Sequence, residues 1–200
     1  MTSVMKMELV RRAFDLFRLY GVKSISMDEM SSGLKVSKKT LYRYFDSKEE
    51  LLKGCVKFRI SQLEIFKTSD DGLLDLLLAC YESYPGLCKS VERRFCYEIR
   101  KYYSGVYEVM MDFLEGYTMA CGKKVETEVA NGYVRKGVSG ELVCLFLRER
   151  FFKLFLGEDT DTDDEVYGEM ILTFALGIST QKGGAYINKK LKERKYNEAY

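Results

Sequence analysis

The chain has 200 residues, of which 46% are hydrophobic and 31% are charged, a balance typical of a soluble globular protein. No apolar run is long enough to cross a membrane and no signal peptide stands at the start, so the sequence predicts a cytoplasmic protein. A single proline in this length favours long, uninterrupted helices.

The composition offers little for metal or redox chemistry. Histidine is absent, and the six cysteines include no C-x-x-C pair, so we expect no metal site and no cofactor. Reduced thiols that pack as small hydrophobic side chains are the expected role of the cysteines. Cys80, Cys88 and Cys96 are spaced by eight residues and could stack along helical faces, which leaves a redox sensor as an alternative.

The charge is unevenly distributed along the chain. The net charge is +2, but residues 1–60 contain 13 basic and 7 acidic residues, whereas the remainder contains 19 and 23. A basic N-terminal segment on an acidic remainder suggests contact with a polyanion, although a solvated basic surface would look the same in sequence.

A first amphipathic helix is predicted from Val4 to Tyr20, and Gly21 ends it. The second helix begins at a capping box formed by Ser26 and Glu29. Lys35 and Val36 then form a turn.

Ser37 is expected to cap a third helix, on which Leu41 and Phe45 face inward. The outward side chains carry cationic, hydroxyl and aromatic groups, which suit phosphate contacts and groove readout, although an ordinary solvated helix is the alternative. These candidates are Lys38, Lys39, Thr40, Tyr42, Arg43 and Tyr44. A second capping box, Ser47 with Glu50, starts a fourth helix that runs to about Phe66 and places Lys48 where a backbone phosphate could dock.

Beyond Lys67 the sequence predicts one helix after another, without strand alternation or repeats. The acidic run Glu158 to Glu165 is expected to be a loop. The predicted helices run from about Asp70 to Tyr84, Leu87 to Tyr103, Val106 to Asn131, Ser139 to Leu156, Asp164 to Ile178 and Gln181 to Lys195.

Aromatic and methionine residues are concentrated around the helix predicted from Val106. Such side chains form adaptable apolar pockets, although core packing is their ordinary role. The charged residues between Arg93 and Arg100, Glu98 among them, could serve such a cavity but are expected at the surface. The candidate ligand-pocket residues are Tyr103, Tyr107, Met110, Met111, Phe113 and Tyr117.

Residues Leu9 to Leu52 resemble the N-terminal domain of the TetR/AcrR family of transcriptional regulators. The resemblance is carried by A-F-D-L-F-R-L-Y-G-V, by S-M-D-E-M and by the ungapped run T-L-Y-R-Y-F-D-S-K-E-E-L-L from Thr40 to Leu52. It implies an all-α homodimer that is usually a repressor. Such a repressor binds a near-palindromic operator and is released from it when a small ligand binds. It also implies a three-helix helix-turn-helix DNA-binding domain (1–47) followed by a helical ligand-binding and dimerisation domain (48–200).

By the same resemblance, Ser37 joins the outward residues of the third helix at the groove, and Lys48 contacts the DNA backbone. Lys35 and Lys39 stand where the family often has glycine, so the operator sequence cannot be inferred. The family forms its dimer through the last two main helices, here Ser139–Leu156 and Asp164–Ile178. The candidate interface residues are Leu142, Leu145, Phe146, Ile171, Phe174 and Ile178.

Three classes of function compete. A ligand-responsive DNA-binding regulator accounts for the capped helices, the basic N-terminal segment and the helical remainder together. An enzyme would have to rely on scattered carboxylates or a cysteine, so no enzymatic activity is predicted. A helical dimeric adaptor with a helix-turn-helix that no longer binds DNA is the alternative. The predicted partners are double-stranded DNA, a second copy of the chain and an unidentified small-molecule effector. No association with a membrane is predicted.

Overall fold

The structure, a computed structural model, describes residues 2–62, 71–87, 90–156 and 164–197. These residues form an all-α fold, as predicted, with one isolated β-bridge between Val134 and Ser179. The helices are α1 (Thr2–Tyr20), α2 (Met27–Gly33), α3 (Lys38–Tyr44), α4 (Lys48–Gln62), α5 (Leu73–Leu87), α6 (Ser90–Tyr102), α7 (Ser104–Lys123), α8 (Val125–Ala130), α9 (Gly140–Leu156), α10 (Asp164–Ile178) and α11 (Gln181–Asn197).

The helix boundaries follow the sequence closely, with two exceptions. Gly21 ends α1 with a φ of +88°, and Gly132 and Gly137 also have positive φ in the loops between α8 and α9. One exception is α5, which continues through Pro85 to Leu87, although a proline there cannot donate a backbone hydrogen bond. The other is the segment predicted as one helix from Val106 to Asn131, which forms the two helices α7 and α8. The acidic stretch 158–163, the predicted end of the fourth helix near Phe66, and Cys88 lie outside the described residues.

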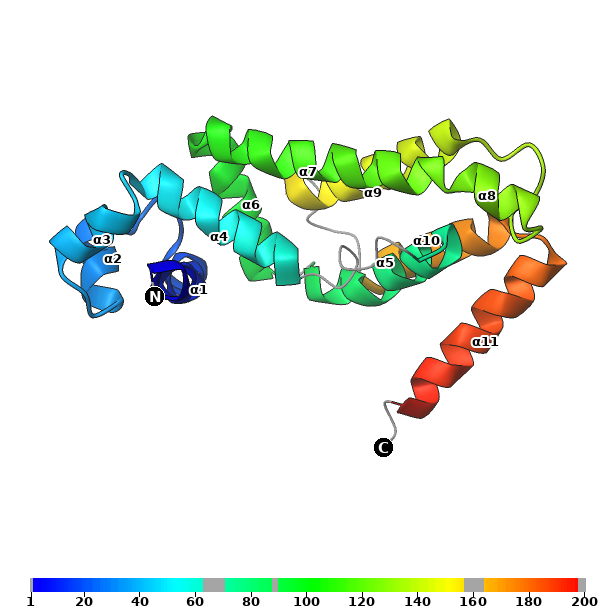
Figure 1. Cartoon of the computed structure of the whole chain (residues 1–200), viewed down its shortest axis with the longest axis horizontal. Helices are drawn as coiled ribbons and strands as arrows, with labels where there is room; N and C mark the ends of the chain where they lie inside the picture. The colour runs from blue at the N-terminus through cyan, green and yellow to red at the C-terminus, as the bar shows by residue number, and fades with distance from the viewer. Residues whose placement is uncertain (1, 63–70, 88–89, 157–163, 198–200) are drawn as a thin grey trace.

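The molecule is elongated, with α1 to α4 gathered at one end (Figure 1). Helix α4 leads away from this end, and the long α7 starts near α6 and extends along much of the molecule toward α8 at the far end. Helices α5 and α10 pack against each other, as do α7 and α9. Among the described residues, no helix combines the length and the apolar character needed to cross a bilayer.

The buried side chains form two cores. The N-terminal core contains residues of α1 to α4 together with residues of α6 and the first half of α7. The body core contains residues of α5, α8, α9, α10, α11 and the second half of α7. Helix α7 therefore contributes to both cores, Val106 and Met110 to the first and Leu114 and Cys121 to the second.

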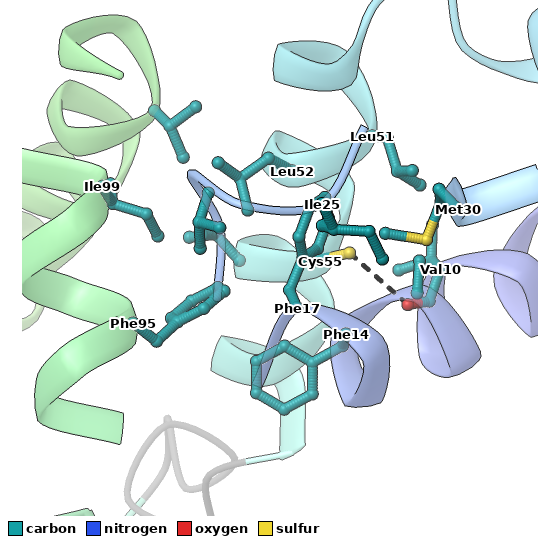
Figure 2. Packing of buried hydrophobic residues seen from close by; sticks show 14 of the residues in the cluster. Val10, Phe14, Phe17, Ile25, Met30, Leu51, Leu52, Cys55, Phe95 and Ile99 are labelled. Carbon is teal, nitrogen blue, oxygen red and sulfur yellow. Dashed lines mark hydrogen bonds between the residues drawn. The ribbon is translucent and has the colours of Figure 1, made fainter. Parts of the chain in front are cut away.

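Helix α6 completes the N-terminal core. Figure 2 shows Phe95 and Ile99 of this helix facing Phe14 and Phe17 of α1. The rings of Phe14 and Phe95 pack edge to face with centroids 5.3 Å apart. Each fully buried phenylalanine contributes about 1.5–3 kcal/mol to stability, so the helix-turn-helix depends on α6 for part of its own core.

The cysteines behave as buried hydrophobic residues rather than as one stacked row. Cys80 lies in the body core, whereas Cys96 lies in the N-terminal core, because α5 and α6 face different cores. Burial raises the pKa of Cys80 to about 12 and that of Cys121 to about 11, so both thiols stay protonated at neutral pH. Cys80 and Cys96 therefore do not form the row that their spacing suggested.

Candidate nucleic-acid interface

Helix α2 begins at the capping box that the sequence predicted. The Ser26 hydroxyl accepts a hydrogen bond from the backbone N–H of Glu29, and the Glu29 carboxylate accepts one from the N–H of Ser26 at 2.8 Å. The hydrogen bonds that the Glu29 carboxylate accepts from the Ser26 N–H and the Ser26 hydroxyl lower the pKa of Glu29. At α4 the box is only half formed, because Ser47 accepts from the Glu50 N–H while the Glu50 carboxylate accepts from Asp46 instead.

The turn between α2 and α3 is fixed by a backbone hydrogen bond to α2 and by a side chain of α1. Lys35 has a φ of +56°, in the left-handed region where the resemblance expects glycine. This conformation costs about 1–2 kcal/mol for a residue with a Cβ atom. The N–H of Val36 donates to the Ser31 carbonyl, and the Arg12 guanidinium of α1 donates to the Leu34 carbonyl at 2.8 Å. These bonds fix the angle between α2 and α3.

Helix α3 is anchored on one side and exposed on the other. The Ser37 hydroxyl caps it by accepting from the Thr40 N–H at 3.0 Å, and Leu41 and Phe45 are fully buried. With 100° between successive residues, Lys39 and Arg43 lie nearly opposite Leu41. Tyr42, 46% exposed, lies beside Lys39. The structure thus brings together the outward Lys39, Thr40, Tyr42 and Arg43.

Lys38 and Tyr44 differ from that outward set. Lys38 forms an ion pair with Asp28 at the start of α2. Tyr44 is half-buried against the N-terminal core, because it follows Leu41 by three residues and shares its side of α3. Its ring lies 5.3 Å from the Arg43 guanidinium and lines a groove between α1 and α4.

Lys48 is the first residue of α4, as predicted, and contacts the turn between α1 and α2. Its ammonium group lies 3.5 Å from the Lys23 carbonyl and 5.7 Å from the centre of the Tyr103 ring. The side chain is thus directed along the turn between α1 and α2 rather than away from the protein. A direct contact of Lys48 with phosphate stays a prediction.

Glu98 of α6 holds the turn between α1 and α2, a role that the sequence analysis missed. Its carboxylate accepts a hydrogen bond from the Lys23 N–H and another from Arg94, both at 2.9 Å. Only 9% of Glu98 is exposed, although the sequence analysis placed it at the surface. Its sequence signal is merely the helical spacing of Arg94 and Glu98, which is common on solvated faces.

The charge of Glu98 is stabilised by its partners. Burial by itself would raise the pKa of this carboxyl, but the hydrogen bonds from Lys23, Arg94 and the backbone of Val22 outweigh burial and hold the pKa below its ordinary value of 4.5. The carboxylate thus links α6 electrostatically to the turn that precedes the helix-turn-helix.

The candidate pocket residues do not gather around one point. Tyr103, Tyr107 and Met110 pack against the N-terminal core, and Met110 is only 4% exposed. Met111 and Tyr117 pack against the body core, where the Tyr117 hydroxyl lies 3.3 Å from the Cys80 sulfur. Two open grooves lined by described residues, one between α1 and α2 and one between α1 and α4, lie elsewhere in the N-terminal region.

The candidate dimer residues divide by burial. Ile171 and Ile178 are 1% and 3% exposed and lie inside the body core, so they cannot contact a partner directly. Leu142 and Leu145 of α9 are 45% and 46% exposed. The rings of Phe146 and Phe174 stack at 3.8 Å and join α9 to α10. Two apolar residues that the sequence analysis missed, Val166 and Leu176 of α10, are also exposed.

The sequence was compared with known protein families and with curated proteins. Residues 9–55, from α1 into α4, match the family described as "Bacterial regulatory proteins, tetR family". No curated protein matches the chain by sequence.

The fold is similar to several solved structures. SmeT, the repressor of the multidrug efflux pump SmeDEF of Stenotrophomonas maltophilia, has a TM-score of 0.67 at 16% identity, covering 89% of this chain and 91% of that one. FadR of Bacillus subtilis, solved in complex with stearoyl-CoA, has a TM-score of 0.65 at 15% identity, covering 86% and 97%. A TetR-family regulator from Pectobacterium atrosepticum has a TM-score of 0.63 at 16% identity, covering 90% and 96%. At these identities the likeness concerns the fold.

The Glu98 contact predicts a pH-dependent loss of stability. Because the pKa of Glu98 is lower in the folded chain than in the unfolded one, its stabilising effect is present above pH 4.5 and is lost as the pH falls through the folded-state pKa. We expect Glu98→Gln to lower the free energy of unfolding by about 1–2 kcal/mol at neutral pH. The difference from the unmodified chain should shrink below pH 4.5, as measured by urea denaturation.

The matched control is Glu108→Gln, which changes an exposed glutamate of α7 that forms no ion pair with a described residue. It should leave the free energy of unfolding unchanged throughout. An equal loss of stability in both variants, or a Glu98→Gln difference that does not vary with pH, would contradict the role assigned to Glu98.

Proposed function

We propose that this chain, whose residues 9–55 match the TetR family, is a DNA-binding transcriptional regulator that acts as a homodimeric repressor of a near-palindromic operator. The observation that carries the proposal is the outward face of α3, where Lys39, Tyr42 and Arg43 stand on a helix anchored by buried residues. In helix-turn-helix proteins such a helix enters the major groove, with its first residues at the base edges.

The side chains of this face suit groove recognition. Lys39 and Arg43 carry cations that can bind guanine or phosphate, and the Thr40 methyl group can contact thymine. The stacking of Arg43 on Tyr44 restricts the guanidinium before DNA arrives, which lowers the entropic cost of binding. The alternative, an adaptor that no longer binds DNA, gives no role to this exposed basic face.

Homodimerisation is supported by the apolar side chains that α9 and α10 leave exposed. Leu142, Leu145, Val166 and Leu176 are each between 40% and 48% exposed on two neighbouring helices. Such residues gain free energy when a second copy covers them. A two-fold dimer would place two α3 helices on successive half-sites, which is why the operator should be near-palindromic.

Control by a small ligand is the least constrained part of the proposal. The support is the position of α7, whose aromatic and methionine residues contribute to both cores. A ligand between these cores would release DNA only if it bound the DNA-free conformation more tightly than the DNA-competent one. The acyl-CoA bound to the similarly folded FadR makes a long-chain acyl-CoA a reasonable first probe.

The DNA-binding surface can be tested with the double substitution Lys39→Ala and Tyr42→Ala. Each lost base contact costs about 1–3 kcal/mol, so specific affinity for DNA from the region upstream of its own gene should fall at least about tenfold. Fluorescence anisotropy would measure binding to this DNA and to a scrambled duplex.

Lys192→Ala, which removes an exposed cation from α11, is the control and should bind as the unmodified chain does. Thermal unfolding should be unchanged in all variants. Specific binding that survives the double substitution would overturn the assignment. So would an unmodified chain that binds the upstream DNA no more tightly than the scrambled duplex.

The dimer surface can be tested with Leu142→Glu combined with Leu145→Glu. Two carboxylates at a covered apolar face would have to be desolvated, so the dimer should dissociate into monomers. Operator affinity should fall with it, because a monomer engages one half-site. Sedimentation velocity would measure the mass, and Leu19→Glu, at a 68% exposed position of α1, provides the control. A double variant that remains dimeric would exclude this face.

Ligand control has a reciprocal thermodynamic test. A compound that lowers operator affinity by a given factor must itself bind the DNA complex more weakly by the same factor. We expect stearoyl-CoA, or another compound that raises the melting temperature, to show this reciprocity in titration calorimetry. Met111→Ala with Phe113→Ala should weaken its binding while operator affinity without ligand is retained. A tightly bound compound that leaves operator affinity unchanged would argue against control at this site.

A further inference from the structure

A cluster of lysine and tyrosine side chains lies where α6 meets the turn between α1 and α2. The Lys23 ammonium group is 4.7 Å from the centre of the Tyr102 ring and 3.5 Å from its hydroxyl oxygen. The Lys101 ammonium group donates to the Tyr97 hydroxyl at 3.1 Å and lies 5.4 and 5.5 Å from the rings of Tyr97 and Tyr102. We refer to Lys23, Tyr97, Lys101 and Tyr102 as the lysine–tyrosine cluster.

The cluster is open to solvent and keeps its positive charge. Tyr97 and Tyr102 are 46% and 41% exposed, and both lysines are exposed. Within the described part of the chain, neither Lys23 nor Lys101 has a carboxylate within ion-pair distance. The Tyr97 hydroxyl and the neighbouring Tyr102 raise the pKa of Lys101, so this ammonium group stays charged at neutral pH.

The nearby acidic groups are engaged with other partners. Glu98, on the same helix, accepts hydrogen bonds from Arg94 and from the Lys23 backbone. On α2, Asp28 pairs with Lys38 and Glu29 caps the helix, and on α4 Glu49 pairs with Lys53. The cluster is therefore a basic surface that these carboxylates do not neutralise directly.

The cluster is continuous with the surface proposed to bind DNA. Helix α3 is connected to the start of α2 by the Lys38–Asp28 pair, and the start of α2 follows the turn that contains Lys23. Lys48, in the first turn of α4, donates to the Lys23 carbonyl. In Figure 1 the corner between α6 and α7 lies beside the first turns of α4, toward the end of the molecule that holds α2 and α3.

We propose that the lysine–tyrosine cluster is a second contact with duplex DNA, in which Lys23 and Lys101 bind backbone phosphates beside the half-site read by α3. The tyrosine rings hold the two ammonium groups in place and leave N–H donors free for phosphate oxygens. Phosphate contacts of this kind fix orientation and affinity but carry no base information. The inference rests on the proposed DNA-binding function and extends it to a helix outside the helix-turn-helix.

The salt dependence of binding tests the inference. Each phosphate contact releases counterions and contributes about 0.9 to the slope of log affinity against log salt concentration. The double variant Lys23→Ala and Lys101→Ala should therefore reduce the magnitude of this slope by about 2 and weaken binding to operator and scrambled duplexes by a similar factor. Lys23→Arg with Lys101→Arg keeps both charges and should restore the slope.

The control removes the same charge elsewhere. Lys189→Ala with Lys192→Ala, on α11, should leave the slope unchanged, and thermal unfolding should confirm that every variant is folded. An unchanged slope in the Lys23→Ala and Lys101→Ala variant would overturn the inference. If the unmodified chain still preferred its operator, the proposed function would be unaffected by that result. A chain that shows no operator preference would instead overturn the proposed function. Weaker binding confined to the operator sequence would also contradict a contact made only with phosphates.

Discussion

The N-terminal core cannot be completed by the helix-turn-helix itself. A segment of about 50 residues buries little apolar surface, and α1 to α4 share their core with α6 and the first half of α7. Within this shared core, the Glu98 carboxylate satisfies the backbone of the turn that leads into α2. The orientation of α2 and α3 therefore depends on where α6 lies, and a movement of α6 would reach the surface proposed to bind DNA.

The surface of α3 is rigid because its anchors are buried and its turn is fixed. Ser37, Leu41 and Phe45 set the position of the helix, and Arg12 of α1 fixes the turn before it. Lys35 adopts a left-handed conformation there at some cost in stability. The core and the turn bonds must offset this cost. The exposed side chains of α3, which we propose contact DNA, therefore stand on a support that would need little reorganisation.

The body carries exposed apolar side chains on α9 and α10 and a long helix, α7, that is shared between the two cores. On α9 and α10 the outward leucines remain available after the protomer has folded, whereas Ile171 and Ile178 are used inside it. Because α7 packs its first half with the N-terminal core and its second half with the body core, a ligand that shifts α7 would act on both. The protonated thiols in the body core add packing rather than reactivity.

Local patterns in the sequence determined the helices, the capping box at Ser26, the cap at Ser37 and the anchors of α3, because helical spacing and capping act between residues three or four positions apart. Only the tertiary structure decided what depends on distant contacts. Glu98 meets a backbone 75 residues away, Lys48 turns toward Lys23, and Ile171 and Ile178 are covered by helices of their own protomer. A helical pattern shows which face of a helix is apolar, but it does not show which neighbour covers that face.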